Sequence, residues 1–169
     1  MSSIIKVDQI QLADGSTPTA GDLGISGSAV QIVDSIYETS VGNVTYSTSV
    51  SWVTSNHSLT ITPTSTTSKI LLTLSGGGLY VDTAGSSAFL NINKSGVGYL
   101  GNSTYGFQRT YAGTSTIITP TSIQYVDTSG TTSAITYTIY FRSSTNGVSA
   151  QYQNSDRGDI CFTAIEFTA

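Results

Sequence analysis

His57 is the only histidine of the chain, so any Ser–His–Asp catalytic triad would have to use it. It lies in the segment Thr54–Ser58, between two predicted strands. The sequence contains no recognisable nucleophile elbow or oxyanion loop, which a hydrolase of this type would need. We therefore predict a solvated loop histidine and no enzyme activity. A metal site built from three copies of His57 on a symmetry axis is an alternative.

A short charged segment precedes the last predicted strand. Arg157, Gly158 and Asp159 match a tripeptide that integrins recognise in other proteins. Asp156 and Asp159 could bind Ca²⁺, but a calcium site needs about six to eight oxygen ligands. A turn explains the same residues, because Gly158 relaxes the backbone before the strand. We therefore predict no metal, no cofactor and no receptor contact from this segment.

Aromatic residues gather in one Gly-, Ser- and Asn-rich segment, together with Arg109. Tyrosine buries a large area at low entropic cost, so such a segment suits a binding surface. One interpretation is a face that binds a glycan or a receptor; the other, which we prefer, is an interface between protomers. The residues predicted for a trimer interface or ligand face are Tyr99, Tyr105, Phe107, Tyr111, Tyr140, Cys161, Ile165 and Phe167.

The composition predicts an all-β protein. Only 9% of the 169 residues are charged, against about 25% in an average soluble protein, and the net charge is −4. Ser, Thr, Gly and Tyr are abundant, whereas the residues that build helix surfaces are scarce. Without a basic stripe, we predict no nucleic-acid binding. Without a signal peptide or a run of about 20 apolar residues, we predict no membrane insertion and export by a route such as lysis.

Two C-terminal segments carry the clearest strand patterns. Apolar and polar residues alternate from Ile135 to Arg142, as in a strand with one buried face. The segment Asp159–Phe167 has apolar side chains on both faces, so we expect a central strand with a second subunit as its outer cover. Cys161, the only cysteine, cannot form an intrachain disulfide, and we predict a small buried hydrophobe. One face carries Ile160, Phe162 and Ala164, and the other carries Cys161, Ile165 and Phe167.

Further strands are predicted along the chain, giving about eight to ten at the spacing typical of a jelly-roll β-sandwich. Gly76–Gly78 should break or bulge one of them, and Pro120 should mark an edge strand or a bulge. The additional predicted strands lie in residues 29–39, 44–52, 59–61, 69–75, 88–93, 99–111 and 115–126.

Residues 1–28 form a separate region, and residues 29–169 form the predicted sandwich domain. The apolar residues of the N-terminal region are too few for a core of their own, so they must pack on another surface. We predict an arm that attaches the protein to its assembly. An N-terminal strand added to the domain's own sheet is the alternative. The residues expected to carry attachment are Ile4, Ile5, Val7, Ile10, Leu12, Leu23 and Ile25.

Two regions resemble known proteins. The segment Ser3–Ile25 closely resembles the N-terminal segment of many small tail-fibre and head-decoration proteins of tailed phages. The segments 138–143, 150–155 and 162–167 resemble the last strands of their C-terminal domains. Those domains are similar to the trimeric jelly roll of complement and tumour-necrosis-factor proteins.

The resemblance implies a homotrimeric virion protein without catalytic activity, assembled in the host cytoplasm and located on the exterior of the particle. Because the chain has an arm and one knob but no shaft, we favour a capsid decoration (cement) protein whose partner is the major capsid protein. One alternative is a short tail-fibre or tail-tip protein that binds a tail adaptor and a host surface glycan. Another is a free carbohydrate-binding module.

Overall fold

A computed structural model describes residues 29–37, 45–153 and 159–167 of the chain. The backbone of this part is all-β, and none of its residues forms a helix that could cross a membrane. The predicted arm, residues 1–28, lies outside the described residues. The strands are β1 (Ala29–Tyr37), β2 (Thr45–Ser47), β3 (Val53–Ile61), β4 (Lys69–Val81), β5 (Ser87–Lys94), β6 (Gly98–Tyr99), β7 (Gln108–Tyr111), β8 (Ile117–Thr128), β9 (Ile135–Ser143), β10 (Ala150–Gln153) and β11 (Ile160–Phe167).

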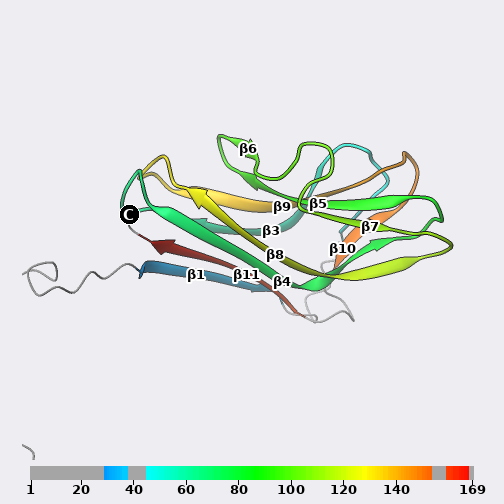
Figure 1. The fold of residues 1–169 in the computed structure, drawn as a ribbon, viewed down its shortest axis with the longest axis horizontal. Helices are drawn as coiled ribbons and strands as arrows, with labels where there is room; N and C mark the ends of the chain where they lie inside the picture. The colour runs from blue at the N-terminus through cyan, green and yellow to red at the C-terminus, as the bar shows by residue number, and fades with distance from the viewer. Residues whose placement is uncertain (1–28, 38–44, 154–158, 168–169) are drawn as a thin grey trace, which may run out of the picture.

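The strands form two antiparallel sheets that lie face to face as two layers (Figure 1). In sheet A, β4 pairs with β11 and β10 along one side and with β8 along the other. The strand β1 pairs with β11, and β2 pairs with β10. In sheet B, β5 pairs with β9 on one side and with β6 and β7 on the other, and β3 pairs with β9. The all-β prediction is confirmed, with two sheets packed as a sandwich.

The core lies between the sheets and follows the predicted alternation. In β9, the side chains of Ile135, Tyr137, Ile139 and Phe141 are buried, while the residues between them are half-buried on the outer side of sheet B. In β11, one face packs into the same core and the other face lies on the outer side of sheet A. Full burial of such a side chain is worth about 1.5–3 kcal/mol, so the shared core holds the two sheets together.

The predicted bulge at Gly76–Gly78 is confirmed. The pairing of β4 with β8 shifts register between Ser75 and Gly78, opposite Pro120. Gly76 has φ +88°, and a Cβ atom there would lie 1.9 Å from the main-chain oxygen of Asp159. Only glycine fits this position, because the φ is left-handed and the next strand is too close. Among the described strands β8 pairs with β4 alone, which agrees with the edge position predicted from Pro120.

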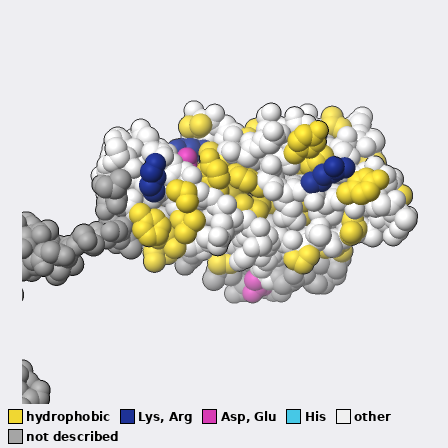
Figure 2. All heavy atoms as spheres, viewed as in Figure 1, with side chains coloured by type: hydrophobic (Ala, Val, Ile, Leu, Met, Phe, Trp, Pro, Cys, Tyr) yellow, Lys and Arg dark blue, Asp and Glu magenta, His cyan; other side chains and the backbone are white. Residues whose placement is uncertain are grey.

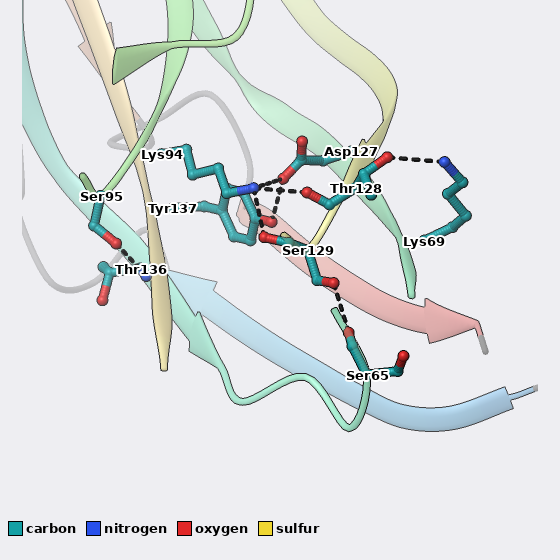
Figure 3. Close-up of polar contacts among 9 residues, drawn as sticks. All are labelled: Ser65, Lys69, Lys94, Ser95, Asp127, Thr128, Ser129, Thr136 and Tyr137. Atoms are coloured by element: carbon teal, nitrogen blue, oxygen red, sulfur yellow. Dashed lines mark hydrogen bonds and ion pairs between the residues drawn. The ribbon is translucent and has the colours of Figure 1, made fainter. Parts of the chain in front are cut away.

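Buried polar groups join the sheets at one end of the sandwich (Figure 3). Lys94 of β5 forms an ion pair with Asp127 of β8, with Nζ 2.7 Å from Oδ2. Its ammonium group also donates to the main-chain oxygens of Thr128 and Ser129. The Tyr137 hydroxyl donates to the same Asp127 oxygen, and burial together with this bond raises the pKa of Tyr137. A fully bonded buried charge is tolerated, and it fixes how the two sheets meet.

Two strand predictions are wrong. Residues 99–111 do not form one strand: β6 ends at Tyr99 and a loop leads to β7. Gly106 turns this loop back with φ +66°, which an uninterrupted strand does not allow. The strand predicted for 44–52 extends, within the described residues, only over β2. Bonds from the amides of Ser49 and Ser51 to the preceding Ser47 and Ser49 hydroxyls turn the chain after β2.

Candidate functional site

His57 is buried inside the sandwich, so the prediction of a solvated loop histidine is wrong. It lies in β3, whose pairing with β9 shifts register between Thr54 and Ser58. Ser55 and His57, within this irregular stretch, are both fully buried. The Nδ1 atom of His57 lies 3.0 Å from the Ser55 hydroxyl oxygen, and its ring meets the Tyr152 ring edge-on at 5.7 Å. Burial lowers the pKa of His57 to about 4.

The surroundings of His57 are those of a core residue. The Ser55 hydroxyl donates to the main-chain oxygen of Ile139 at 3.0 Å, which ties β3 to β9. Among the described residues no group of three His, Cys, Asp or Glu could hold a metal ion, and no pocket is present. Asp156, Arg157 and Gly158 lie outside the described residues, and Asp159 is exposed just before β11.

The residues predicted for a trimer interface or ligand face lie on different surfaces. Phe107 packs against the core, with its ring 5.1 Å from that of Tyr125. Tyr111 is exposed at the end of β7, under the guanidinium of Arg109 at 5.2 Å. Three more, Tyr99, Tyr105 and Tyr140, lie on the outer side of sheet B, and Cys161, Ile165 and Phe167 lie on the outer side of sheet A.

A group of rings on the outer side of sheet B forms a surface that we call the aromatic face. It consists of Trp52, Phe89, Tyr99, Tyr105 and Tyr140, with Arg142 among them. The Tyr99 ring lies 5.4 Å from Trp52 and 5.5 Å from Tyr140. The Arg142 guanidinium lies 5.3 Å from the Trp52 ring and 4.7 Å from the Phe89 ring, and the Tyr105 ring lies 5.8 Å from the Phe89 ring, tilted by 56°. The rings therefore form one continuous group, joined by cation–π and ring–ring contacts.

The loop between β6 and β7 holds the aromatic face in place. The Trp52 indole nitrogen donates to the Ser103 oxygen at 2.8 Å, and Arg142 donates to the main-chain oxygen of Thr104. Beneath the loop, buried Asn91 accepts from the Gly101 amide at 2.9 Å and donates to the Asn102 oxygen. These bonds fix the loop on β5, so the rings above it are positioned before any partner arrives.

Charge is distributed unequally between the sheets. The five strands of sheet B, all within the described residues, carry no Asp or Glu. They carry Lys94, which is paired with Asp127 in the core, and two cations on the outer side, Arg109 and Arg142. Both arginines are cross-strand neighbours of Phe89, one on each side. The aromatic face is therefore positive in a chain whose net charge is negative.

The second surface is an aliphatic row across sheet A. Ile32 of β1 pairs with Ile165 of β11, Ile165 pairs with Leu71 of β4, and Leu71 pairs with Val126 of β8. Ile32 is 63% and Val126 58% exposed, so the ends of the row are open. Figure 2 shows hydrophobic side chains gathered at the left of the molecule, over the ends of β4, β8 and β11.

Two further members of the predicted set lie on the same outer side of β11 as Ile165. Phe167, at the end of β11, is 36% exposed. Cys161 is partly buried within the single chain, with its sulfur 3.6 Å from the Thr163 hydroxyl, so its full burial would require the second subunit expected on this face and stays a prediction. Within a single chain the outer face of β11 therefore has no full cover.

Sequence reasoning missed Trp52, Phe89 and Arg142 as members of the aromatic face. Trp52 falls in the predicted strand 44–52. Phe89 of β5 and Arg142 of β9 become neighbours only through the pairing of these two strands. The alternation of Tyr140 and Arg142 did indicate one outer side of β9. Cross-strand pairing brings the rest together, and a single sequence carries no direct signal for it.

No family model matches this chain, and no curated protein matches it. The two faces must therefore be interpreted from their own chemistry.

Proposed function

We propose that this chain is a homotrimeric structural protein of a virion, which binds the assembled capsid from outside as a decoration protein. The observation that carries the proposal is the aliphatic row on sheet A. Its four side chains lie on four neighbouring strands; Leu71 and Ile165 are half-buried, and Ile32 and Val126 at the two ends are exposed. A contiguous exposed apolar patch is typical of a site of association.

A second copy of the chain is the occupant that suits this row. Covering apolar surface gains about 25 cal/mol for each Å² removed from water, and three copies can each cover a neighbour's row around one axis. Within β4, Lys69 is the only charged residue, and its amine donates to the Thr128 hydroxyl at 2.8 Å. A contact that keeps the Lys69 amine at its rim leaves this charge in water.

The order of the strands supports a jelly roll. The neighbours across sheet A are β1, β11, β4 and β8, and those across sheet B are β3, β9, β5 and β7. The chain passes between the sheets at each step from β7 to β10. This interleaving of two antiparallel sheets is expected when two Greek keys fold together.

The proposed mechanism is mechanical. A protein that binds only the assembled shell stabilises that shell by mass action. The resemblance of Ser3–Ile25 to phage virion proteins supports attachment through residues 1–28, with the major capsid protein as partner. Deletion of residues 1–28 should leave a folded trimer that no longer docks on heads. Full occupancy of heads by the deleted protein would contradict this role.

The trimer is tested by Val126→Asp. Val126 is at the open end of the row, so the substitution should leave the fold intact and place three charges in the interface. We expect monomers by sedimentation velocity, with a circular dichroism spectrum like that of the parent. Val97→Asp is the matched control, because Val97 is 71% exposed in the turn between β5 and β6 and should leave the trimer unchanged. A monomeric parent protein, or a trimeric V126D, would refute the proposal.

A tail-fibre or tail-tip protein that binds a tail adaptor is the second candidate. The aromatic face favours it, because exposed tyrosines on a rigid base suit recognition of a host surface glycan. The copy number of the protein in purified particles separates the two candidates. A copy number that matches a repeated site of the capsid shell indicates the head. A much smaller copy number, set by the symmetry of the tail, indicates the tail.

A further inference from the structure

We propose that the aromatic face binds an acidic saccharide, that is, a sugar that carries a carboxylate. The inference rests on the proposed trimer only in one respect: the trimer uses sheet A and leaves sheet B free. It does not depend on whether the protein is located on the head or on the tail. The site consists of the rings of Trp52, Tyr99 and Tyr105 together with the cations Arg109 and Arg142.

The rings offer a preformed apolar surface. Tyr105 is 57% exposed over Phe89, and Tyr99 is exposed between Trp52 and Tyr140. A sugar ring has a flat face of C–H bonds that packs on an aromatic ring, and hydroxyl groups around its edge. Because the loop under these rings is already bonded to β5, little conformational entropy is lost when a ligand settles on them.

Polar groups lie between and beside the rings. The loop that carries Tyr105 also carries Asn102, Ser103 and Thr104, and all three are exposed. The side-chain oxygen of Asn102 accepts from the amides of Thr104 and Tyr105, which fixes the backbone of the loop. Short polar side chains beside tyrosines supply adaptable hydrogen bonds, which suit the hydroxyl groups of a sugar. An aliphatic partner would offer these polar side chains no hydrogen-bond partner.

The cations select the charge of the ligand. Arg109 is exposed on β7, held by a bond from Nε to the Ser87 hydroxyl at 2.9 Å and by its contact with Tyr111. The tip of a guanidinium is a planar fork that matches a carboxylate. Arg142 donates to the main-chain oxygens of Val50 and Ser143, which fix its charge in position without neutralising it. Figure 2 shows a basic side chain flanked by hydrophobic ones over β5 and β7.

Two other occupants suit the face less well. A second copy of the chain would bring apolar strips, and the aliphatic row already supplies that contact on the opposite side of the sandwich. Duplex nucleic acid needs many cations along a stripe, and this face has two. A small ligand with one or a few negative charges matches the two arginines of this face best.

The test uses the full-length protein on an array of uronate- and sialate-bearing oligosaccharides and their neutral counterparts, followed by titration calorimetry with the strongest ligand. We expect binding of an acidic sugar, and at least tenfold weaker binding of its neutral counterpart. Tyr105→Ala should weaken binding of both. Arg109→Gln should remove the preference for the acidic sugar, with little effect on the neutral one. Lys69→Gln is the matched control, because it removes the same charge from sheet A and should change neither.

Several outcomes would overturn the inference. These are no binding by the parent protein, equal binding of the acidic and neutral sugars, equal effects of R109Q and K69Q, or stronger binding of a single-stranded oligonucleotide. The trimer is judged separately by sedimentation. A trimeric parent that binds no sugar refutes this inference alone, and a monomeric parent that binds acidic sugar through Tyr105 and Arg109 refutes the trimer alone.

Discussion

In both sheets, residues on the outer side alternate along each strand with residues of the shared core, yet the two outer sides present different chemistry. Sheet A exposes aliphatic side chains in a row, from Ile32 to Val126. Sheet B exposes tyrosines and a tryptophan around two arginines. An aliphatic strip has no directional groups, so it suits a repeated, self-complementary contact. Rings with charges and hydroxyl groups have direction, and they suit a small polar ligand.

The two faces also differ in how they are built. The aliphatic row comes directly from strand pairing, because its four residues are register partners. The aromatic face needs a loop as well: Trp52 lies before β3, and Tyr105 lies in the loop between β6 and β7. Displacing the loop between β6 and β7 from β5 should therefore disrupt the aromatic face alone. A change in the register of β4 should instead disrupt the aliphatic row on sheet A. Substitutions at two glycines separate these effects.

Gly76→Ala should have the largest effect. A Cβ atom would lie 1.9 Å from the main-chain oxygen of Asp159, and the φ of +88° strains any other residue. Since Gly76 pairs with Ile160 at the start of β11, the strand that carries Ile165 would be displaced. We expect a loss of about 3–5 kcal/mol in the free energy of unfolding, together with loss of the trimer. Chemical denaturation and sedimentation measure both.

The control for this prediction is Gly85→Ala. Gly85 has φ +78°, but no atom lies within 4 Å of the position that a Cβ would take. It therefore carries the backbone strain without the clash, and we expect a loss of about 1 kcal/mol and an intact trimer. Equal losses in the free energy of unfolding for G76A and G85A would show that the close approach of β4 and β11 does not contribute to the cost of G76A.

Much of the fold was predictable from patterns that depend on one strand at a time. The alternation in β9 and the two-faced pattern of β11 were readable, as were the bulge at Gly76 and the edge strand at Pro120. Each of these is a local consequence of side-chain period, φ preference or a missing amide. The position of His57 was not readable, because an irregular register inside β3 decides which way its side chain points.

The candidate site was predictable only in part, for a related reason. Tyr99, Tyr105 and Tyr140 were identified as candidates from their types, but Phe89 and Arg142 join them through pairing between distant segments. Sequence reasoning also grouped Ile165 and Phe167 with the tyrosines, although the two sets lie on opposite sides of the sandwich. Residue type indicated what could bind, while sheet topology decided what lies together.

Acid should weaken both faces together, because His57 belongs to the core they share. Burial lowers its pKa from 6.5 to about 4, so the folded state favours the neutral ring. The unfolded chain takes up a proton between these values, and stability is therefore complete above pH 6.5 and falls as the pH drops toward 4. We expect a loss of roughly 2–3 kcal/mol over this range, measured by urea denaturation at several pH values.

The variant His57→Gln provides the control for the acid effect. It should be less stable at pH 7 but should lose the dependence on pH between 6.5 and 4, because no group at this position then titrates. Burial raises the pKa of Glu166, but hydrogen bonds from the main-chain amide and the hydroxyl of Thr64 outweigh it and lower the pKa, so the contribution of Glu166 is lost only at more acidic pH. An unchanged slope in H57Q would assign the acid effect to other groups.

Gly106→Ala should have a smaller effect on stability than Gly76→Ala and the most selective effect on function. A Cβ atom would lie 2.0 Å from the Leu90 oxygen and 2.9 Å from the Trp52 ring, so the loop must lift away from β5. Since the displaced segment is a loop on the outer side of sheet B that contacts the core through Phe107, while the strands themselves stay paired, we expect a cost of about 1–2 kcal/mol. Sugar binding should be lost while the trimer persists, as measured by calorimetry and sedimentation on the same sample. A variant that lost the trimer but kept the sugar would reverse the roles of the two faces, because it would mean that the rings of sheet B hold the copies together.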